Sequence, residues 1–160
     1  MRVKCKIREL FTETKSVAEN KEEIVTFAAK ETCEMNHPFE LLSTITAQPA
    51  NEEFGRPIAQ AMQAAFGSKA SEEEYTAAGI ICALFLSAIL AEFPTIKLHT
   101  YVKNYRDGNK PFSFDCKSYD KIADNINCYR LLLIDKDMQY IEREITKQDL
   151  LESLDFFTNR

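Results

Sequence analysis

The hydrophobic pattern changes its period along the chain, and each period predicts a different kind of element. Near the N-terminus, Val3, Cys5 and Ile7 alternate with charged residues, which is the period of two of a half-buried β-strand. From about residue 16 to residue 93 the apolar spacing is helical, with breaks at "NHPFE", "QPANEEF" and "GSKASEEE". The sequence therefore predicts an N-terminal strand followed by a helical middle segment.

Proline and capping residues mark where these helices begin. Pro38 and Pro57 suit the first turn of a helix, and Asn51 suits an N-cap. In "SEEE", the Ser71 hydroxyl can accept from the backbone of Glu74 while the Glu74 carboxylate accepts from the backbone of Ser71, which is a capping box. Carboxylates in a first turn also favour the helix macrodipole. We therefore interpret this acidic run as a helix start rather than a metal site.

The helix that follows, "TAAGIICALFLSAILAEFP", is apolar on all sides. Its fifteen uncharged residues from Ala77 to Ala91 span about 22 Å, against about 30 Å for the hydrocarbon core of a membrane. Three Glu precede it and no basic residue follows before Lys97, so the basic flank of a membrane helix is missing. Because a helix of this kind is normally buried, the sequence predicts the central helix of a core and no membrane crossing.

Small residues recur every four positions on this helix, at Gly79, Ala83, Ser87 and Ala91. This ladder of small residues lets a neighbour approach closely, while bulky residues such as Phe85 lie on the broad opposite side. We expect another helix of the same chain on the ladder and a sheet on the bulky side. A homodimer through the ladder is the alternative.

After Pro94 the pattern returns to a period of two. Apolar residues alternate with polar ones in "TIKLHTYVKNY", residues 95–105, and again in "PFSFDC", so the two stretches predict a β-hairpin. A three-residue loop at "RDG" pairs Leu98 with Cys116 and makes Cys116 a core thiol. A two-residue turn instead places His99 opposite Cys116 as a Cys–His nucleophile pair. The first register is favoured because it keeps the apolar residues on one face.

The C-terminal part of the chain adds further helices and strands. Ser118 is placed to cap a short helix at "YDKIADN", and the apolar run "CYRLLLID" suits a central strand covered on both faces. A turn at Lys136-Asp137 leads into a strand at "MQYIEREI". Thr146 and Asp149 form a capping-box variant that starts a final helix.

Together these elements predict an α+β fold. We expect a single domain over residues 1–160, in which a buried central helix of the helical middle segment packs on a mostly antiparallel sheet of about four to five strands, with a C-terminal helix to close it. A chain of 160 residues buries about two-thirds of its unfolded surface, which is enough for a self-sufficient core.

Charge and cysteine content narrow the class of partner and the compartment. The net charge is −5, yet residues 9–92 hold fourteen Glu against five basic residues. This imbalance argues against nucleic-acid binding in general and permits an acidic face for a basic protein partner, although Glu on exposed helix faces is the plainer interpretation. The five cysteines form no CxxC pair, and the N-terminus lacks the apolar core of a secretory signal. We therefore expect free thiols in a reducing cytoplasm.

Few residues suit catalysis or metal binding. His37 and His99 are the only histidines. Cys33 and His37 have an i,i+4 ligand spacing, but Pro38 interrupts it and no second ligand pair is present, so a buried Cys33 beside a capping or exposed His37 is favoured. Phosphate-loop and nucleophile motifs are missing as well. We predict no catalytic residue, cofactor or metal. Cys33 with His37, and His99 with Tyr101, are the first suspects if the protein is an enzyme.

The polar side of the predicted strand at 95–105 is the most unusual surface. Its basic and aromatic residues are Lys97, His99, Tyr101, Lys103 and Tyr105. Beside the basic residues of the N-terminal strand, they would resemble a platform for single-stranded nucleic acid, where bases stack on rings and cations meet phosphate. An ordinary solvated sheet face is favoured, because the rest of the chain would repel phosphate. The candidate binding surface consists of these five residues together with Glu72 and Glu73.

The leading function is a non-catalytic protein-binding module that occludes a basic partner. In size and acidity the chain resembles the small inhibitor and immunity proteins that bacteria and phages make against basic toxins or nucleases, a likeness of general character without a shared motif. The alternatives are a small cytosolic enzyme with an unrecognised site and a single-stranded nucleic-acid binder that uses the polar sheet face. We expect a cytoplasmic monomer or homodimer.

Overall fold

The computed structural model describes residues 37–108, 112–127 and 129–159. The contacts of the chain divide it into Met1–His37 and Pro38–Arg160, and the fold of the second unit is described below. The predicted N-terminal strand and the helical pattern between residues 16 and 36 lie outside the described residues. The single domain over residues 1–160 stays a prediction.

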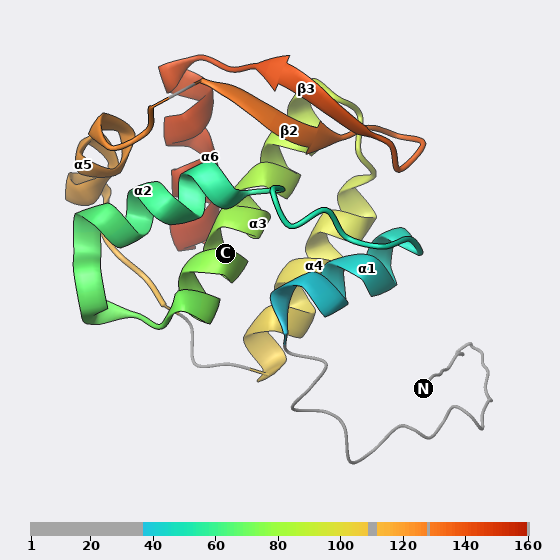
Figure 1. The fold of residues 1–160 in the computed structure, drawn as a ribbon, viewed down its shortest axis with the longest axis horizontal. Helices are drawn as coiled ribbons and strands as arrows, with labels where there is room; N and C mark the ends of the chain where they lie inside the picture. Colours follow the sequence, from blue (N-terminus) through green and yellow to red (C-terminus); the bar gives the residue numbers. More distant parts are fainter. Residues whose placement is uncertain (1–36, 109–111, 128, 160) are drawn as a thin grey trace. The chain divides into compact units, whose positions relative to one another are not determined.

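Helices dominate this unit (Figure 1). In chain order its elements are α1 (Pro38–Thr46), α2 (Arg56–Phe66), the 3₁₀ turn η3 (Gly67–Lys69), α3 (Glu72–Leu90), α4 (Thr95–Gly108), the 3₁₀ turn η4 (Cys116–Ser118), α5 (Tyr119–Asp124), β2 (Arg130–Ile134), β3 (Tyr140–Glu144) and α6 (Lys147–Asn159). The fold is mixed helix and sheet, as predicted. In the described residues, however, the sheet has two antiparallel strands, fewer than the larger sheet that the sequence predicted.

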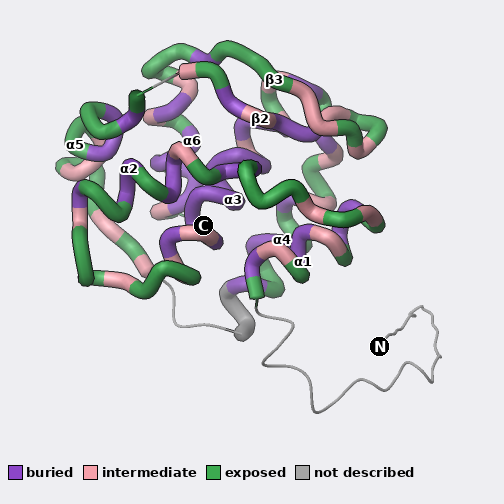
Figure 2. The backbone as a smooth tube through the Cα atoms, viewed as in Figure 1, coloured by how far each residue is buried: buried purple, intermediate pink, exposed green. Residues whose placement is uncertain are grey.

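The central helix of the core is α3. It runs through the middle of the unit, where α2, α4, α6 and β2 pack around it (Figure 1), and burial is concentrated along it (Figure 2). By length and composition α3 could also cross a membrane, and 61% of its most apolar stretch is buried inside the fold. Length and composition do not separate a core helix from a membrane span, but the packing places α3 in the core.

The predicted helix starts are mostly confirmed. Pro38 opens α1, and Pro57 lies in the first turn of α2. Ser71 caps α3 with the full capping box: its Oγ accepts from the Glu74 N–H at 3.1 Å, and Glu74 Oε1 accepts from the Ser71 N–H at 2.8 Å. The prediction for Asn51 is wrong, because its side chain accepts from the Glu53 N–H in a turn and the N-cap of α2 is a glycine.

The ladder of small residues on α3 is covered within the chain. At Gly79 the backbone of α3 lies so close to the start of α2 that a Cβ atom there would come within 2.9 Å of the Ala59 Cβ and would also overlap the Gly55 carbonyl oxygen. Ala83 and Ser87 are fully buried. The helix predicted on the ladder is therefore α2, and a homodimer through the ladder is wrong because its residues are already covered.

The sheet meets α3 on the ladder, and this corrects the predicted placement. Ser87 Oγ accepts from the backbone N–H of Ile134 in β2 at 2.9 Å and donates to the Ala83 carbonyl oxygen at 2.8 Å. On the bulky side, Phe85 stacks on Phe156 of α6 with ring centroids 4.8 Å apart. The buried N–H of Ile134 at the end of β2 needs a hydrogen-bond acceptor. Ser87 supplies this acceptor, whereas an apolar side chain such as Phe85 on the bulky side has none.

The predicted strand at 95–105 is wrong, because these residues form α4. The buried positions are Leu98, Tyr101, Val102 and Tyr105, the i, i+3, i+4, i+7 spacing of an amphipathic helix. Ile96, which a strand would place on the same face as Leu98, is 74% exposed. The spacing between Leu98 and Val102 fits a period of two as well as a period of 3.6, so the alternation concealed a helical pattern.

The predicted β-hairpin is wrong together with that strand. Residues 112–115 are irregular, and Cys116, expected to be a core thiol, is exposed in η4. Neither of the two predicted registers exists. The alternating phenylalanines instead place their rings against α2, as Phe114 does on Phe66 with ring centroids 5.3 Å apart.

The strands β2 and β3 form the predicted strand–turn–strand unit. They pair antiparallel with Leu132 opposite Glu142, and the turn is held by Asp135, whose Oδ1 accepts from the N–H groups of Asp137 and Gln139 at 2.9 and 3.0 Å. Within the described residues β2 has one partner strand, so in this part of the chain it is not the central strand that the sequence predicted.

The C-terminal elements begin much as predicted. Thr146 and Asp149 form a reciprocal capping box at the start of α6, with both hydrogen bonds at 3.0 Å. Ser118 precedes α5, but its side chain makes no capping hydrogen bond. Instead Asp115 accepts from the Lys117 N–H one turn earlier, at 3.0 Å.

Candidate functional site

The basic and aromatic residues of the predicted platform do not share a face. Along α4 they turn with the helix, so Tyr101 is 0% and Tyr105 3% exposed, whereas His99 and Lys103 are exposed. Bases stack only on accessible rings. The single-stranded nucleic-acid platform is therefore wrong, because its aromatic members lie in the core.

Two members of the predicted surface join α4 to α1. The Tyr101 hydroxyl donates to the Pro38 carbonyl oxygen at 2.9 Å, and Lys97 Nζ donates to the Ile45 carbonyl oxygen at 2.9 Å. Burial raises the pKa of Tyr101 well above its ordinary value, so this hydroxyl stays protonated and keeps donating. Both side chains are structural, one at each end of α1.

The residues suspected of catalysis are not brought together. Tyr101 is buried, while His99 is exposed on the other side of α4, with its ring centroid 6.4 Å from that of Phe156. Cys33 lies outside the described residues. Burial raises the pKa of Cys82 to about 12, so this thiol carries no thiolate at neutral pH. In the described ranges, no three His, Cys, Asp or Glu side chains are grouped as metal ligands.

Glu72 and Glu73 are both exposed in the first turn of α3, and Glu72 lines a cleft of about 230 Å³. Three elements form this cleft: the first turn of α1, the stretch from Glu52 into α2, and the start of α3. Its polar residues are Glu52, Arg56, Gln60, Gln63, Glu72 and Thr76. We call it the acidic cleft.

Apolar residues also line the acidic cleft. Phe54 is fully buried and Tyr75 is 2% exposed, while Phe39 is partly buried at the α1 side. The Tyr75 hydroxyl turns away from the cleft and donates to the Gly67 carbonyl oxygen at 2.7 Å, and burial raises its pKa. Of these three apolar residues, Phe39 therefore keeps the most accessible surface.

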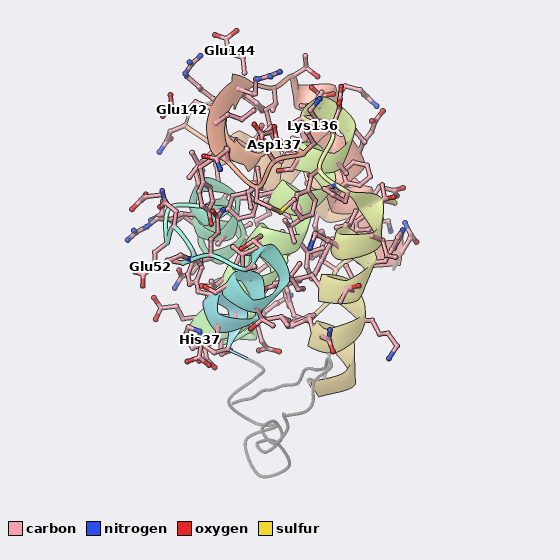
Figure 3. The ribbon with its side chains drawn as sticks, turned by 90° about the vertical axis from the view of Figure 1, so that its right-hand side faces the viewer. His37, Glu52, Lys136, Asp137, Glu142 and Glu144 are labelled. Atoms are coloured by element: carbon pink, nitrogen blue, oxygen red, sulfur yellow. The ribbon has the colours of Figure 1, made fainter. Side chains whose placement is uncertain are left out.

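The rim of the acidic cleft carries a negative balance. Arg56 is bound by Glu53, with Nη1 2.8 Å from Oε2. Glu52 lies at the surface on the side where α1 and α2 are seen (Figure 3), and Glu72 enters from α3. Residues 38–92 hold seven Glu against Arg56 and Lys69. A cation is the ligand that this rim favours.

A second cleft, of about 530 Å³, includes Glu74 of α3 in its lining. It is lined by Phe66, Phe112 and Phe114, with Lys69 and Asp115 among its polar residues. The Tyr75 ring, which lines the acidic cleft, also contacts Phe112 with centroids 5.2 Å apart. The contact between Tyr75 and Phe112 therefore connects the lining of the acidic cleft with that of the second cleft.

Sequence reasoning found Glu72 but missed the α2 side of the acidic cleft. Arg56, Gln60 and Gln63 recur at i, i+4 and i+7 in "RPIAQAMQAAF", which is one polar stripe of a helix. That stripe was a usable signal for a polar face. Its position opposite Glu72 depends on the close contact at Gly79, which the sequence pattern does not specify.

Comparison with known proteins adds no relative. No family model matches the chain, and no curated protein or solved structure is significantly similar to it.

Proposed function

We propose that this protein is a non-catalytic binding module that occludes a basic protein partner, in the manner of an inhibitor or immunity protein, through the acidic surface at the start of α3. The observation that carries the proposal is the acidic cleft, where Glu52 and Glu72 face a common hollow between three helices. Glu73 extends the same charge onto the exposed first turn of α3. Complementary charge of this kind accelerates association with a basic surface and disfavours acidic partners.

The size and chemistry of the cleft favour binding over catalysis. Its volume is about 230 Å³, below the roughly 300–1,000 Å³ of sites that enclose drug-sized ligands. Its polar groups are carboxylates, amides, a hydroxyl and one guanidinium already bound by Glu53. A general base or nucleophile is recognised by a partner that activates it, and the charged groups here are instead arranged to hold a cation.

The first test identifies a candidate partner from the genes that lie next to the gene of this protein. A neighbouring gene for a basic toxin or nuclease would provide a purified protein whose association with this chain is measured by calorimetry over a range of salt concentrations. We expect tight binding that weakens as salt rises, because the attraction is between exposed charges. A location among metabolic genes, or binding that does not respond to salt, would contradict the proposal.

Charge reversal tests the surface itself. Replacing Glu72 and Glu73 together by Lys should weaken binding of the partner by about tenfold or more, chiefly through a slower association rate. Glu144→Lys is the matched control, because Glu144 is exposed on β3 (Figure 3), and β2, its partner strand, contacts the opposite half of α3 at Ser87. If both variants weaken binding equally, the start of α3 is not the binding surface.

A further inference from the structure

We propose that the acidic cleft receives one arginine side chain of the basic partner, an inference that rests on the proposed function. Arginine is among the residues that most often dominate binding energy at protein interfaces, where they fill desolvated pockets. The acidic cleft has the volume, the acceptors and the rigidity that such an anchor requires, as the following observations show.

The volume suits one long side chain. At about 230 Å³ the cleft is too small for a ligand of the size that ordinary small-molecule sites enclose. Phe39, which is only partly buried, offers apolar surface at the α1 side of the cleft, and long basic side chains lay their methylene stems on such surfaces while the charged head stays in polar surroundings.

Side chains that can accept hydrogen bonds line the cleft from several elements. Glu52 enters from the turn before α2, Gln60 and Gln63 from one stripe of α2, and Glu72 from α3. Two carboxylate and two amide side chains thus line one hollow, together with Arg56, whose charge is offset by Glu53. A guanidinium carries five N–H donors in a planar fork that matches carboxylate groups, whereas a lysine ammonium is a compact point charge with three donors. Acceptors spread around several sides therefore favour arginine.

The base of the cleft is rigid. Gly55 and Ala59 line it, and the same two residues form the contact with Gly79 of α3 that leaves no room for a Cβ atom. The helices that carry the acceptors are therefore held at a constant spacing before any partner arrives. A site formed in advance loses less conformational freedom when it binds.

The test uses the full chain, labelled with ¹⁵N, and a defined probe, N-acetyl-arginine N-methylamide. We expect saturable chemical-shift changes centred on the backbone of Gln60, Gln63 and Glu72. The lysine analogue should bind several-fold more weakly, and the citrulline analogue, which keeps the shape but lacks the charge, about tenfold more weakly. Spermidine tests a free polyamine as the source of the cation, and binding of spermidine at least as tight as that of arginine would overturn the inference.

Variants locate the probe. Glu72→Gln and Gln63→Ala should each weaken arginine binding, Glu72→Gln by about tenfold because it removes a charge-assisted hydrogen bond. Gln148→Ala on α6 is the matched control and should leave binding unchanged. Thermal melts of all three variants show whether each remains folded, and arginine shifts centred on other residues would overturn the assignment.

The outcomes separate the two proposals. Salt-dependent binding of a basic protein without arginine binding in the cleft would refute the anchor and leave the binding function standing. Arginine binding in the cleft without any basic protein partner would refute the binding function and, with it, the anchor, and would leave a site for free arginine.

Discussion

The two halves of α3 are joined to the rest of the protein by different kinds of contact. In the first half, the Gly79 backbone lies directly against α2, with no room for an added Cβ. In the second half, Ser87 accepts a hydrogen bond from the backbone of Ile134 in β2. Both are small residues of one ladder, yet the first contact depends on shape and the second on a polar partner.

This difference teaches what each contact tolerates. Atoms of a backbone cannot move aside as the end of a flexible side chain can, so the contact at Gly79 should resist any added volume. The contact at Ser87 should instead be sensitive to the loss of one oxygen atom, because burying an N–H group without an acceptor costs free energy. Substitutions on α3 can therefore separate steric from polar stabilisation within one helix.

The largest effect is expected at the shape-dependent contact. Gly79→Leu should lower the free energy of unfolding by about 3 kcal/mol or more, because the new side chain meets Gly55 and Ala59. Ala64→Leu, on the exposed side of α2, is the control and should change stability little. Chemical denaturation of both variants measures the effect. A variant at Gly79 as stable as the control would show that α2 does not lie against this residue.

The next largest effect is expected one turn further along the ladder. Ala83 is fully buried, and Ala83→Leu should lower the free energy of unfolding by about 1–3 kcal/mol by overpacking. The measurement is a thermal melt followed by circular dichroism. A melt that matches the parent would mean that the ladder has spare room at this position.

The polar contact is tested by removing one oxygen atom. Ser87→Ala leaves the buried Ile134 N–H without its acceptor and should destabilise the fold by about 1–3 kcal/mol. Ser153→Ala is the matched control, since Ser153 is equally buried but its hydroxyl donates only to Leu150 in its own helix. If both variants lose the same amount of stability, the effect comes from the hydrogen bond that each serine hydroxyl donates to a carbonyl oxygen of its own helix. The contact with the sheet would then contribute nothing measurable.

A third side of α3 carries a pH-dependent contribution. Burial raises the pKa of Cys82 from its ordinary value of 9.0 to about 12, where its Sγ lies 3.6 Å from the Ser153 carbonyl oxygen of α6. The stability that this neutral thiol contributes is complete below pH 9.0 and is lost as pH rises through about 12. Between pH 7 and pH 10 the parent should therefore lose about 1 kcal/mol more than Cys82→Ala does.

Denaturant unfolding of both proteins at the two pH values measures this difference. The buried tyrosines titrate in both proteins and cancel in the comparison. Parallel losses in the two proteins would show that Cys82 ionises as freely in the fold as in the unfolded chain.

The smallest effects are expected at the start of α3. Ser71→Ala breaks the capping box and should lower the free energy of unfolding by about 1 kcal/mol. Glu73→Ala should change it by about 0.5 kcal/mol or less, because Glu73 is exposed and acts only on the helix dipole. Thermal melts of the two variants show which substitution lowers stability more. A larger loss for Glu73 would mean that its carboxylate has a structural partner.

The contrast between α3 and α4 shows where sequence reasoning succeeded. For α3, the capping box of Ser71 and Glu74 marked the start of the helix within three residues. The run of apolar residues that follows predicted a buried helix, and the helix is buried. For α4, Leu98 and Val102 fitted both periods, so the choice depended on Tyr101 and Tyr105, whose rings can face either water or a core.

The candidate site was predicted only in part for a similar reason. Glu72 was selected for its charge, and the structure places it in the acidic cleft. Gln60 and Gln63 attracted no attention, because an amide on a helix surface is ordinary until another element lies opposite. Lys97 and Tyr101 were selected as surface groups, but the helical turn points both toward α1.

The sequence by itself determined the elements whose signals are local. The starts of α3 and α6 and the turn at Lys136-Asp137 follow from contacts within a few residues. Only the tertiary structure decided that residues 95–105 are helical, that Ser87 meets β2 and that the acidic cleft exists. These features depend on which elements lie opposite one another, and that is a property of long-range packing that a period along the chain does not record.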